Sequence, residues 1–351
     1  MNPPNKIVHV NLSKSFRGGE FQTLALIKAL HMQGVQQELV CRKNKPLAAQ
    51  ASQVAGLQVT EVGGPLGGHG CRQDVQARTV VHAHEARAVY WAWLENRIRR
   101  TPYLVTRRVI NPIGSSWLTR KAYQAASALV AVSAFAAKVL QARVERPVAV
   151  VMDACRALPT VPTSGQGLGT LPGSPRIGHV GEFDDAVKGQ GLLIDAFLEL
   201  LQTRPDARLF LIGDGKDRSA FLARYKDEER IVFVGAVTHV HEWLQQLDVF
   251  CFPSQMEALG SSVLEAMQMG VPVIVSDAGG LPELVGDQER GWVVSGRSPQ
   301  VWAKAIQQVL QHAEQTQARV ARAQEFVAGH QAHHMADQYR AIYAGLFDQR
   351  R

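Results

Sequence analysis

The residue types and spacing best suited to chemistry occur in one segment, FCFPSQMEALGSSVLEAMQMGVPVIVSDAGGLPELV. Glu257 and Glu265 have seven residues between them, and Gly260, Ser261 and Ser262 lie in that interval. The apolar run that follows predicts a helix beginning near Gly260, whose first N–H groups suit a phosphate. Glu265 would lie about one turn into this helix, where a carboxylate can accept both hydroxyls of a ribose. The alternative is that both glutamates only flank the helix and interact with its dipole.

A second candidate loop follows the first apolar run, in SKSFRGGEFQTLALIKAL. Gly18 and Gly19 precede a helix expected near Glu20, so the backbone could approach a ligand and the helix N-terminus could bind an anion. The loop matches neither GxGxxG nor the Walker A pattern, which argues against a Rossmann dehydrogenase and a P-loop ATPase. A plain tight turn would also account for the two glycines.

The elements that would position these residues follow a repeated sequence pattern. Each repeat consists of a short β-branched apolar run, a turn and a helix-length periodic segment. Such alternation predicts an α/β fold with parallel, doubly wound sheets. These sheets bind ligands at the carboxyl ends of their strands, so two such domains would face each other across a cleft. The expected strands are Lys6–Asn11, Gln37–Val40, Val80–His82, Tyr103–Thr106, Ala128–Ala131, Val148–Val151, Arg176–Val180, Arg208–Ile212, Ile231–Val234, Val249–Phe252, Pro272–Val275 and Gly291–Val294.

The length of 351 residues exceeds the roughly 250 to 300 at which a single core stops growing, so two domains are expected. Residues 157–175 contain four prolines and four glycines, which predicts a linker between domains at 1–156 and 176–330.

Residues 331–351 are expected to form a C-terminal helix that crosses toward the first domain. An apolar stripe at helical spacing needs a surface to pack on, and it is formed by Met335, Tyr339, Ile342 and Leu346. Three histidines near the start of this helix are interpreted as solvated residues rather than metal ligands: His330, His333 and His334.

The charge is unevenly divided along the chain. Residues 1–175 hold 21 Lys+Arg and 8 Asp+Glu, whereas residues 176–351 hold 17 and 23. The basic half suggests a polyanionic partner, such as nucleic acid, an anionic membrane or a phosphorylated glycan, although surface charge kept for solubility is the alternative. A composition of 46% hydrophobic and 20% charged residues excludes disorder, collagen-like repeats and a disulfide scaffold.

The four cysteines form no CxxC pair, so neither a zinc site nor a thioredoxin-type motif is expected. We expect a reduced cytoplasmic protein. The N-terminus lacks the apolar core of a secretion signal, and no run of about 18 apolar residues occurs. Any contact with membranes is therefore expected at their surface.

The stretch from Arg87 to Lys121 combines eight Lys+Arg and one acid with five aromatic side chains: Tyr90, Trp91, Trp93, Tyr103 and Trp117. Such a mixture suits an anionic lipid surface or single-stranded nucleic acid. The alternative is that the tryptophans belong to the core. Arg107 and Arg108 follow an expected strand end, so they would point toward the cleft and could bind acceptor phosphates.

The sequence resembles the family 4 retaining glycosyltransferases, which have the GT-B fold and use nucleotide-sugar donors. The resemblance extends over nearly the whole chain and is strongest between Ile177 and Val294. The motifs that carry it follow the family's order: IGHVGEFDDAVKGQGLLIDAF, LFLIGDGKDRSAF, IVFVGAV and DVFCFPS. It is closest to the bacterial type that builds lipopolysaccharide and other envelope glycans.

The resemblance implies roles for matching residues. Lys188 is similar to the lysine that contacts the donor diphosphate, Glu265 to the carboxylate that holds the ribose, and Glu257 to the one near the donor sugar. His84 resembles the histidine whose ring or backbone contacts the transferred sugar. The resemblance thus implies His84, Lys188 and Glu257 as catalytic residues.

The donor site would also use backbone groups. Gly260 and the N–H groups of Ser261 and Ser262 resemble the phosphate cradle, and Gly181 the glycine of the family's Gly-Arg turn. Gly18 and Gly19, already noted, resemble the first-domain loop that closes on the donor.

Some positions depart from the family pattern. Glu182 stands where the family has an arginine, so Arg176, Lys216 or a first-domain residue would have to replace that cation. The usual Asn-Gly-Val-Asp is VMDAC, which leaves only Asp153, and Ala258 and Leu259 replace the more frequent Gly and Phe. These departures affect the identity of the donor sugar more than the fold.

No metal or other cofactor is expected. The chain has no DxD cluster suited to a divalent ion, and Asp184-Asp185 is interpreted as an exposed acidic pair. The family instead implies that Lys188 and helix N-termini stabilise the leaving diphosphate, whose oxygen accepts the acceptor's proton.

The sequence therefore predicts a glycosyltransferase that moves a hexose or related sugar, with retention, from a donor expected to be UDP-linked to lipopolysaccharide or another envelope glycan. We expect it in the cytoplasm, peripheral on the inner face of the cytoplasmic membrane, with a glycan or lipid-linked acceptor and no nucleic-acid partner. The alternatives are a non-catalytic protein of the same fold that binds nucleic acid or another polyanion, and a nucleotide-sugar epimerase.

Overall fold

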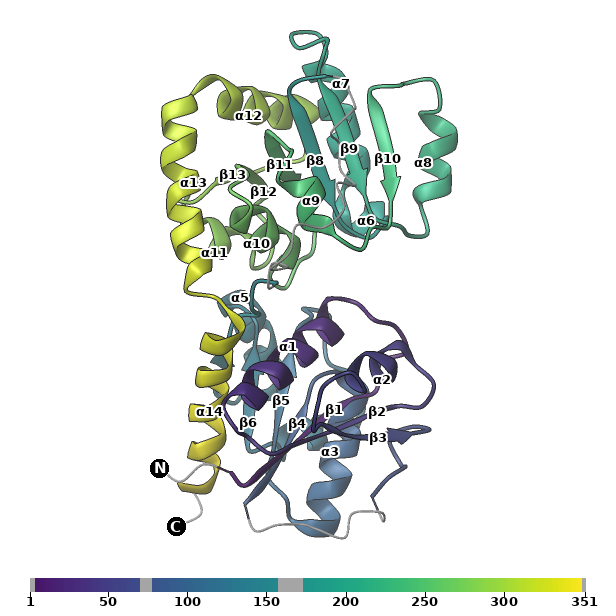
Figure 1. Cartoon of the computed structure of the whole chain (residues 1–351), viewed down its shortest axis with the longest axis vertical. Helices are drawn as coiled ribbons and strands as arrows, with labels where there is room; N and C mark the ends of the chain where they lie inside the picture. Colours follow the sequence, from purple (N-terminus) through teal and green to yellow (C-terminus); the bar gives the residue numbers. More distant parts are fainter. Residues whose placement is uncertain (1–3, 70–77, 157–172, 349–351) are drawn as a thin grey trace. The chain divides into compact units, whose positions relative to one another are not determined.

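The computed structural model describes residues 4–69, 78–156 and 173–348, and it divides the chain into two compact units. Unit 1 comprises Met1–Ala154 and His330–Arg351, and unit 2 comprises Cys155–Gly329 (Figure 1). The chain thus passes to unit 2 two residues before the expected linker and returns at His330. Most of that linker, residues 157–172, lies outside the described residues.

Unit 1 is built on a parallel sheet in the order β3-β2-β1-β4-β5-β6-β7. The order reverses between β1 and β4, so the loops that follow these two strands diverge and leave a crevice at the carboxyl edge. The strands are β1 (Lys6–Asn11), β2 (Gln37–Arg42), β3 (Gln58–Val62), β4 (Thr79–Ala83), β5 (Tyr103–Arg107), β6 (Ala128–Ala131) and β7 (Ala149–Val150).

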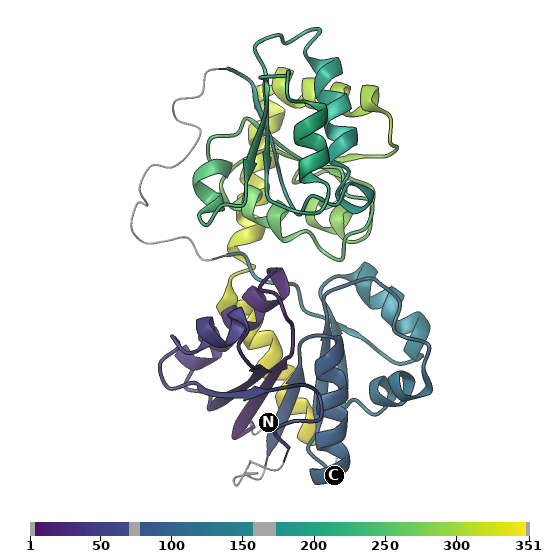
Figure 2. The ribbon, with the colours of Figure 1, turned by 90° about the vertical axis from the view of Figure 1, so that its right-hand side faces the viewer.

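Helices cover both faces of the unit 1 sheet (Figure 2), and alternate side chains of its strands pack against the two helical layers. Ile7 of β1 packs in a cluster with residues of α1 and α14, whereas its neighbour Val8 packs in a cluster with residues of α3, α4 and α5. Burial on both faces explains why the central strands are continuously apolar. The helices are α1 (Gly18–Met32), α2 (Pro46–Ala51), α3 (Ala86–Arg99), α4 (Trp117–Gln124), α5 (Ala134–Val144) and α14 (Ala332–Asp348).

Unit 2 repeats the plan with a parallel sheet in the order β10-β9-β8-β11-β12-β13, which reverses between β8 and β11. The strands are β8 (Arg176–Val180), β9 (Arg208–Ile212), β10 (Ile231–Gly235), β11 (Val249–Phe252), β12 (Val273–Ser276) and β13 (Trp292–Val294). The helices are α6 (Asp185–Lys188), α7 (Gln190–Leu200), α8 (Arg218–Arg224), α9 (Val240–Leu244), α10 (Ser261–Gln268), α11 (Leu281–Val285), α12 (Pro299–Gln311) and α13 (Ala313–Ala328).

The C-terminal helix α14 packs on unit 1, as expected. Met335, Tyr339 and Leu346 are buried in the cluster that also contains Ile7 and Leu30, and Tyr343 is equally buried. Figure 1 shows α14 running beside α1. The end of the chain therefore completes the core of the first domain.

The sequence interpretation was wrong for several surface features. The strand β3 was not expected, because its residues QVTEV are mostly exposed or half-buried and lack an apolar run. Trp91 and Tyr103 belong to the core and cannot form a lipid-facing surface, whereas Trp117 is 70% exposed.

Candidate functional site

The loops at the β8/β11 crevice of unit 2 approach each other so closely that they require glycine. Gly213, at φ +136°, lies where a Cβ atom would be 2.0 Å from the carbonyl oxygen of Gly181. Gly215 similarly would collide with the backbone of Phe183. The Gly-x-Gly segment after β9 therefore supports the turn after β8, which places Gly181 at the crevice.

Lys188 and Glu257 form the charged pair of this crevice. Lys188 ends α6, and Gly189, at φ +71°, turns the chain into α7. The Nζ atom of Lys188 lies 2.5 Å from Oε2 of Glu257 and 5.2 Å from the ring centre of Phe252 at the end of β11. Both charged side chains are mostly buried, so their pairing offsets the cost of removing two charges from water.

Backbone contacts fix the loop that carries Glu257. The N–H group of Gly280 donates to the Glu257 carbonyl oxygen at 3.0 Å, and a Cβ atom on Gly279 would lie 1.9 Å from that oxygen. The SDAGG turn after β12 thus positions Glu257, a role that the sequence interpretation did not assign to these glycines.

The helix α10 begins at the residue predicted from the sequence. Its N-cap is Gly260, at φ +101°, where a Cβ atom would lie 2.6 Å from Cδ2 of Leu281. Among the described residues, the N–H groups of Ser261 and Ser262 have no hydrogen-bond acceptor. With no acidic residue in its first turn, the N-terminus of α10 is suited to an anion.

Glu265 lies on α10 and pairs with Arg156, which follows the crossover into unit 2. The Nε atom of Arg156 is 3.6 Å from Oε1 of Glu265. Burial raises the pKa of Glu265, while the nearby Arg156 lowers it. A mostly buried carboxylate with one distant cation retains capacity to accept hydrogen bonds from a ligand.

Two predictions about charged residues near this crevice were wrong. Asp184 and Asp185 are half-buried rather than merely exposed: Asp184 pairs with Lys216 at 3.0 Å, and Oδ1 of Asp185 accepts from the N–H of Gly191 at 2.7 Å. Arg176 begins β8, at the amino edge of the sheet, so it cannot replace the family arginine at the carboxyl edge. Lys216 is paired with Asp184, and its use in place of the family arginine stays a prediction.

Unit 1 has a cavity of about 260 Å³ at the β1/β4 reversal. Gly18 and Gly19 form the first turn of α1, which begins two residues earlier than predicted, and Arg17 caps it. Four residues proposed from the sequence line this cavity together: Gly19, His84, Arg107 and Arg108.

Arg108 is held in the wall of this cavity by a buried ion pair. Its Nε donates to Oδ1 of Asp153 at 2.9 Å, and its Nη1 lies 3.3 Å from Nδ1 of His84. Asp153 is the acidic residue that remains of the motif expected from the family. Its partner in the structure is Arg108. The Nη2 atom of Arg108 is buried without a hydrogen-bond partner among the described residues.

Three buried histidines lie against Arg108, and sequence reasoning identified only one of them, His84. His9 on β1 and His82 on β4 pack beside it, and the ring centres of His82 and His84 are 3.7 Å apart. Burial lowers the pKa of all three, to about 3 for His9 and well below the usual range for His82 and His84. The HxH spacing on an apolar strand was the available signal.

The ring nitrogens of the three histidines lie within 4.8 Å of one another, which is close enough to share a metal ion. The surroundings oppose that use. The nitrogens of His82 face the hydroxyls of Tyr343 and Thr106, both at 2.7 Å, and the Arg108 cation adjoins His84. The geometry therefore fits hydrogen-bonded neutral imidazoles better than ligands of a dication.

Arg107 and Arg108 do not lie on the molecular surface. Arg107 is 8% exposed and donates to the Tyr123 hydroxyl at 3.2 Å and to the Asn111 carbonyl oxygen. Both arginines line the cavity, and their burial argues against direct contact with a membrane surface, whereas their proposed contact with an acceptor stays a prediction.

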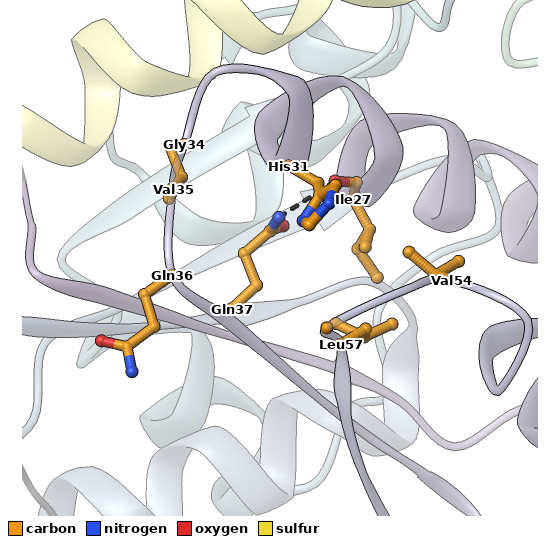
Figure 3. A pocket seen from close by; sticks show the side chains of 9 residues that line it. Ile27, His31, Gly34, Val35, Gln36, Gln37, Val54 and Leu57 are labelled. Carbon is orange, nitrogen blue, oxygen red and sulfur yellow. Dashed lines mark hydrogen bonds between the residues drawn. The ribbon is translucent and has the colours of Figure 1, made fainter.

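A second cavity of unit 1, about 220 Å³, lies at the opposite edge of the sheet, between the end of α1 and the start of β3 (Figure 3). It is lined by Ile27, His31, Gly34, Val35, Gln36, Gln37, Val54, Gly56 and Leu57. Because it faces the amino ends of β2 and β3, it is separate from the crevice that the fold provides for ligands.

Comparison with known proteins gives one family match, to the model described as "Glycosyl transferases group 1", over residues 174–312. The matched segment contains Gly181, Lys188, Glu257, Gly260 and Glu265, all brought to one crevice in unit 2.

Two curated relatives match part of the chain. The lipopolysaccharide core biosynthesis mannosyltransferase LpsB of Rhizobium meliloti is 34% identical over 140 residues, 37% of this chain and 40% of the relative. The N-acetyl-alpha-D-glucosaminyl L-malate synthase of Bacillus anthracis is 32% identical over 170 residues, 47% and 44% of the two chains. The chain thus matches less than half the length of these relatives.

Solved structures share the fold over nearly the whole chain. Sucrose-phosphate synthase from Thermosynechococcus elongatus superposes with a TM-score of 0.80 at 18% identity, covering 98% of this chain and all of that one. Anabaena Alr3699/HepE in complex with UDP gives 0.79 at 20% identity, covering 97% and 100%. The predicted α/β fold of GT-B type is confirmed. Within the described part of the chain, no helix is long and apolar enough to cross a membrane.

Proposed function

We propose that the protein transfers a glycosyl group from a nucleotide-sugar donor to a glycan acceptor, because residues 174–312 match the family model described as "Glycosyl transferases group 1". One observation carries this proposal: Lys188, Glu257, Glu265 and the N-terminus of α10 gather at the carboxyl edge of one sheet. A cation, a helix N-terminus and a buried carboxylate together suit a diphosphate joined to a ribose.

The crevice suggests how transfer proceeds. In the proposed complex, the diphosphate replaces Glu257 as the partner of Lys188. It also accepts hydrogen bonds from the backbone N–H groups of Ser261 and Ser262. These preorganised donors stabilise the negative charge that grows on the diphosphate as its bond to the sugar breaks. Glu257, released from Lys188, then faces the donor sugar. The acceptor oxygen bonds to the anomeric carbon on the face from which the diphosphate leaves, so that configuration is retained, and the acceptor's proton passes to a diphosphate oxygen.

We propose a UDP-linked donor and a lipopolysaccharide or other envelope glycan as acceptor. Solved relatives of the same fold bind UDP and UDP-glucose, and LpsB is named for lipopolysaccharide core biosynthesis. Neither comparison favours the nucleic-acid-binding or epimerase alternatives.

In unit 1 we place the acceptor in the cavity beside Arg108. One nitrogen of this guanidinium has no partner within the described ranges, and Arg17 and Arg107 line the same wall. Glu20 and Glu85 also line it, but their carboxylates accept backbone N–H groups of Arg17, Leu12, Arg87 and Ala88. The cavity therefore suits an acceptor that bears a phosphate or carboxylate near its reacting hydroxyl.

We further propose that α4 contacts the inner face of the cytoplasmic membrane, which would keep the protein in the cytoplasm and peripheral. Its outward residues are Trp117, Leu118, Arg120 and Lys121, an apolar and cationic mixture suited to anionic lipid. Co-sedimentation with phosphatidylglycerol vesicles should weaken in Trp117→Ala but not in Leu222→Ala, a similar truncation of an exposed side chain on α8. Equal binding by both variants would contradict this membrane surface.

The donor is tested with a panel of UDP-, GDP- and ADP-sugars in a thermal shift assay. Binding to the native state alone raises the melting temperature, so one sugar nucleotide should stabilise the protein and the others should not. The same shift is expected with and without EDTA, since we propose that no metal is required. If no nucleotide or nucleotide-sugar shifts the transition, the proposed function is wrong.

A further inference from the structure

The cavity of unit 1 contains a histidine that sequence reasoning proposed as a catalytic group, His84. Its ring nitrogens both have partners: Nδ1 lies 3.3 Å from Nη1 of Arg108, and Nε2 lies 2.9 Å from Nδ1 of His9. A ring whose two nitrogens are occupied has none left to take a proton from a substrate. The imidazole must therefore act through its neighbours.

The direction of these bonds is fixed first at Arg108. A guanidinium has N–H groups only and can never accept a hydrogen bond. Nδ1 of His84 must therefore carry a lone pair toward Arg108, and the single proton of a neutral ring must be on Nε2. A doubly protonated ring would point an N–H group at a cation.

The direction is fixed independently at the other end, by Gln37. Its amide nitrogen donates to the carbonyl oxygen of Ile27 at 3.0 Å, the dashed line in Figure 3. The amide oxygen therefore faces Nε2 of His9, at 3.0 Å. An oxygen accepts, so His9 must donate from Nε2 and accept at Nδ1.

The hydrogen-bond directions set by Arg108 and by Gln37 are compatible at the bond between His84 and His9. His84 donates from Nε2 and His9 accepts at Nδ1, which is the one arrangement that satisfies both Arg108 and Gln37. We propose that Gln37, His9 and His84 are positioning residues, a one-way relay of hydrogen bonds that holds Arg108 ready for the acceptor. The relay keeps His84 neutral with its proton on Nε2, so His84 is not the general base of the reaction.

The surroundings of the relay support this assignment. His84 faces His9, His82 and Arg108, and beyond them lie Asp153, Glu20, Tyr339 and Tyr343. Burial and the adjacent cation both lower the pKa of His84, which keeps the ring neutral. Asp153 holds the Nε side of Arg108 while His84 contacts Nη1, so the unpaired Nη2 is the nitrogen left for a ligand.

The relay is tested directly by NMR of the full chain labelled with ¹⁵N in its histidine rings, because imidazole nitrogen shifts distinguish the two neutral tautomers. Spectra of His9→Gln and His84→Gln would assign the signals. Both rings are expected to be protonated on Nε2 and to show no titration between about pH 6 and 8. A proton on Nδ1 of either ring, or a titration in that range, would overturn the proposal.

A matched pair of variants tests what the relay does. Gln37→Met keeps the length of the side chain but removes the acceptor, so His9 and His84 should populate both tautomers and the acceptor KM should rise about tenfold. The donor KM should not change. Gln36→Met makes the same replacement at the exposed neighbouring position and should alter neither tautomer nor KM. A Gln37→Met protein with unchanged tautomers and unchanged acceptor KM would contradict the relay.

This inference rests on the proposed function only for the role of Arg108, and the two can fail separately. If the tautomers are as expected but no sugar is transferred, the proposed function is wrong and the relay stands. If sugar is transferred but His84 carries its proton on Nδ1, the relay alone is wrong.

Discussion

At the scale of residues, the proposed donor site consists of charges that are already paired with each other. Lys188 contacts Glu257, and Glu265 lies near Arg156. Without these pairs, the protein would hold buried, unpaired charges whenever no ligand is bound. The proposed donor therefore exchanges partners in the crevice, since diphosphate can replace Glu257 and ribose can join Arg156 at Glu265.

Lys188→Ala removes the cation proposed to contact the diphosphate. We expect a loss of roughly 100-fold or more in kcat/KM, because the lysine is proposed to stabilise charge that develops in the transition state. Steady-state kinetics with the stabilising donor would measure it. Lys304→Ala, on the exposed side of α12, is the control and should behave as the unmodified protein. Similar activity in both variants would exclude Lys188 from the site.

Glu265→Gln keeps the shape of the side chain and removes its charge. Loss of a charge-assisted bond to the ribose should weaken nucleotide binding by about 10- to 100-fold, measured by titration calorimetry with UDP. Stability should change little, since burial already disfavours this carboxylate. Glu314→Gln makes the same change at an exposed position of α13 and should bind UDP normally. If both variants bind alike, Glu265 does not hold the ribose.

At the scale of elements, the alternation of apolar runs and helices was sufficient to predict the architecture. Strands such as Arg176–Val180 and Ala128–Ala131 have the predicted bounds because both faces are buried and the apolar run matches the strand. The edge strand β3 could not be predicted, since only the last of its five residues, QVTEV, is buried. Pattern alone identifies elements that need burial and misses those at the edge of a sheet.

The candidate site was predictable where the backbone is the functional group. Gly260 could be found because the residues after it begin an apolar helix, and Gly181 because it resembles a glycine of the family motif. His9 could not, because its role depends on Gln37 and His84, which are 28 and 75 positions away in the chain. Such long-range contacts have no local sequence signal.

Gly260→Ala tests the element that would bind phosphate. The residue has φ +101°, and the new Cβ atom would lie 2.6 Å from Leu281, so we expect a loss of about 1 to 3 kcal/mol and weaker UDP binding. Gly345→Ala is the control, because it lies inside α14, where no atom of the described residues outside the helix's own backbone lies within 4 Å of a new Cβ atom, and it should stabilise slightly. Thermal unfolding and calorimetry would compare them. A Gly260→Ala protein as stable as Gly345→Ala would contradict the described turn.

At the scale of the whole molecule, the division of charge follows the division into units. The basic residues before Pro175 belong mostly to unit 1, with the cavity that contains Arg108, and the acidic second half contains the crevice proposed to bind the donor. The proposed anionic acceptor and the proposed membrane contact both lie on the basic unit. The proposed donor recognition instead depends on a few local cations, chiefly Lys188.

Buried histidines also divide unequally between the units, which predicts a difference in acid stability. The pKa is lowered for His9, His82 and His84 in unit 1 and for His179, to about 4, in unit 2. A lowered native pKa means that the unfolded chain binds more protons, so stability is full above about pH 6.5 and falls as the pH drops below it. The loss by pH 5 is about 2 kcal/mol for each histidine.

Differential scanning calorimetry at pH 7.5, 6 and 5 should therefore show the unit 1 transition falling further than that of unit 2. The raised pKa values of Asp153 and Glu265 act in the opposite sense, one in each unit, and do not reverse the order. Gly260→Ala would identify the unit 2 transition by lowering it. Equal shifts of both transitions would contradict the assignment of three neutral histidines to unit 1.

The central claim is that the crevice after β8 and β11 binds the donor diphosphate, and a crystal structure of the chain with UDP or the stabilising UDP-sugar tests it most directly. We predict the diphosphate between Lys188 and the N–H groups of Ser261 and Ser262, with the ribose hydroxyls on Glu265. Nucleotide bound elsewhere, or Lys188 still paired with Glu257 in a structure with bound nucleotide, would contradict the account.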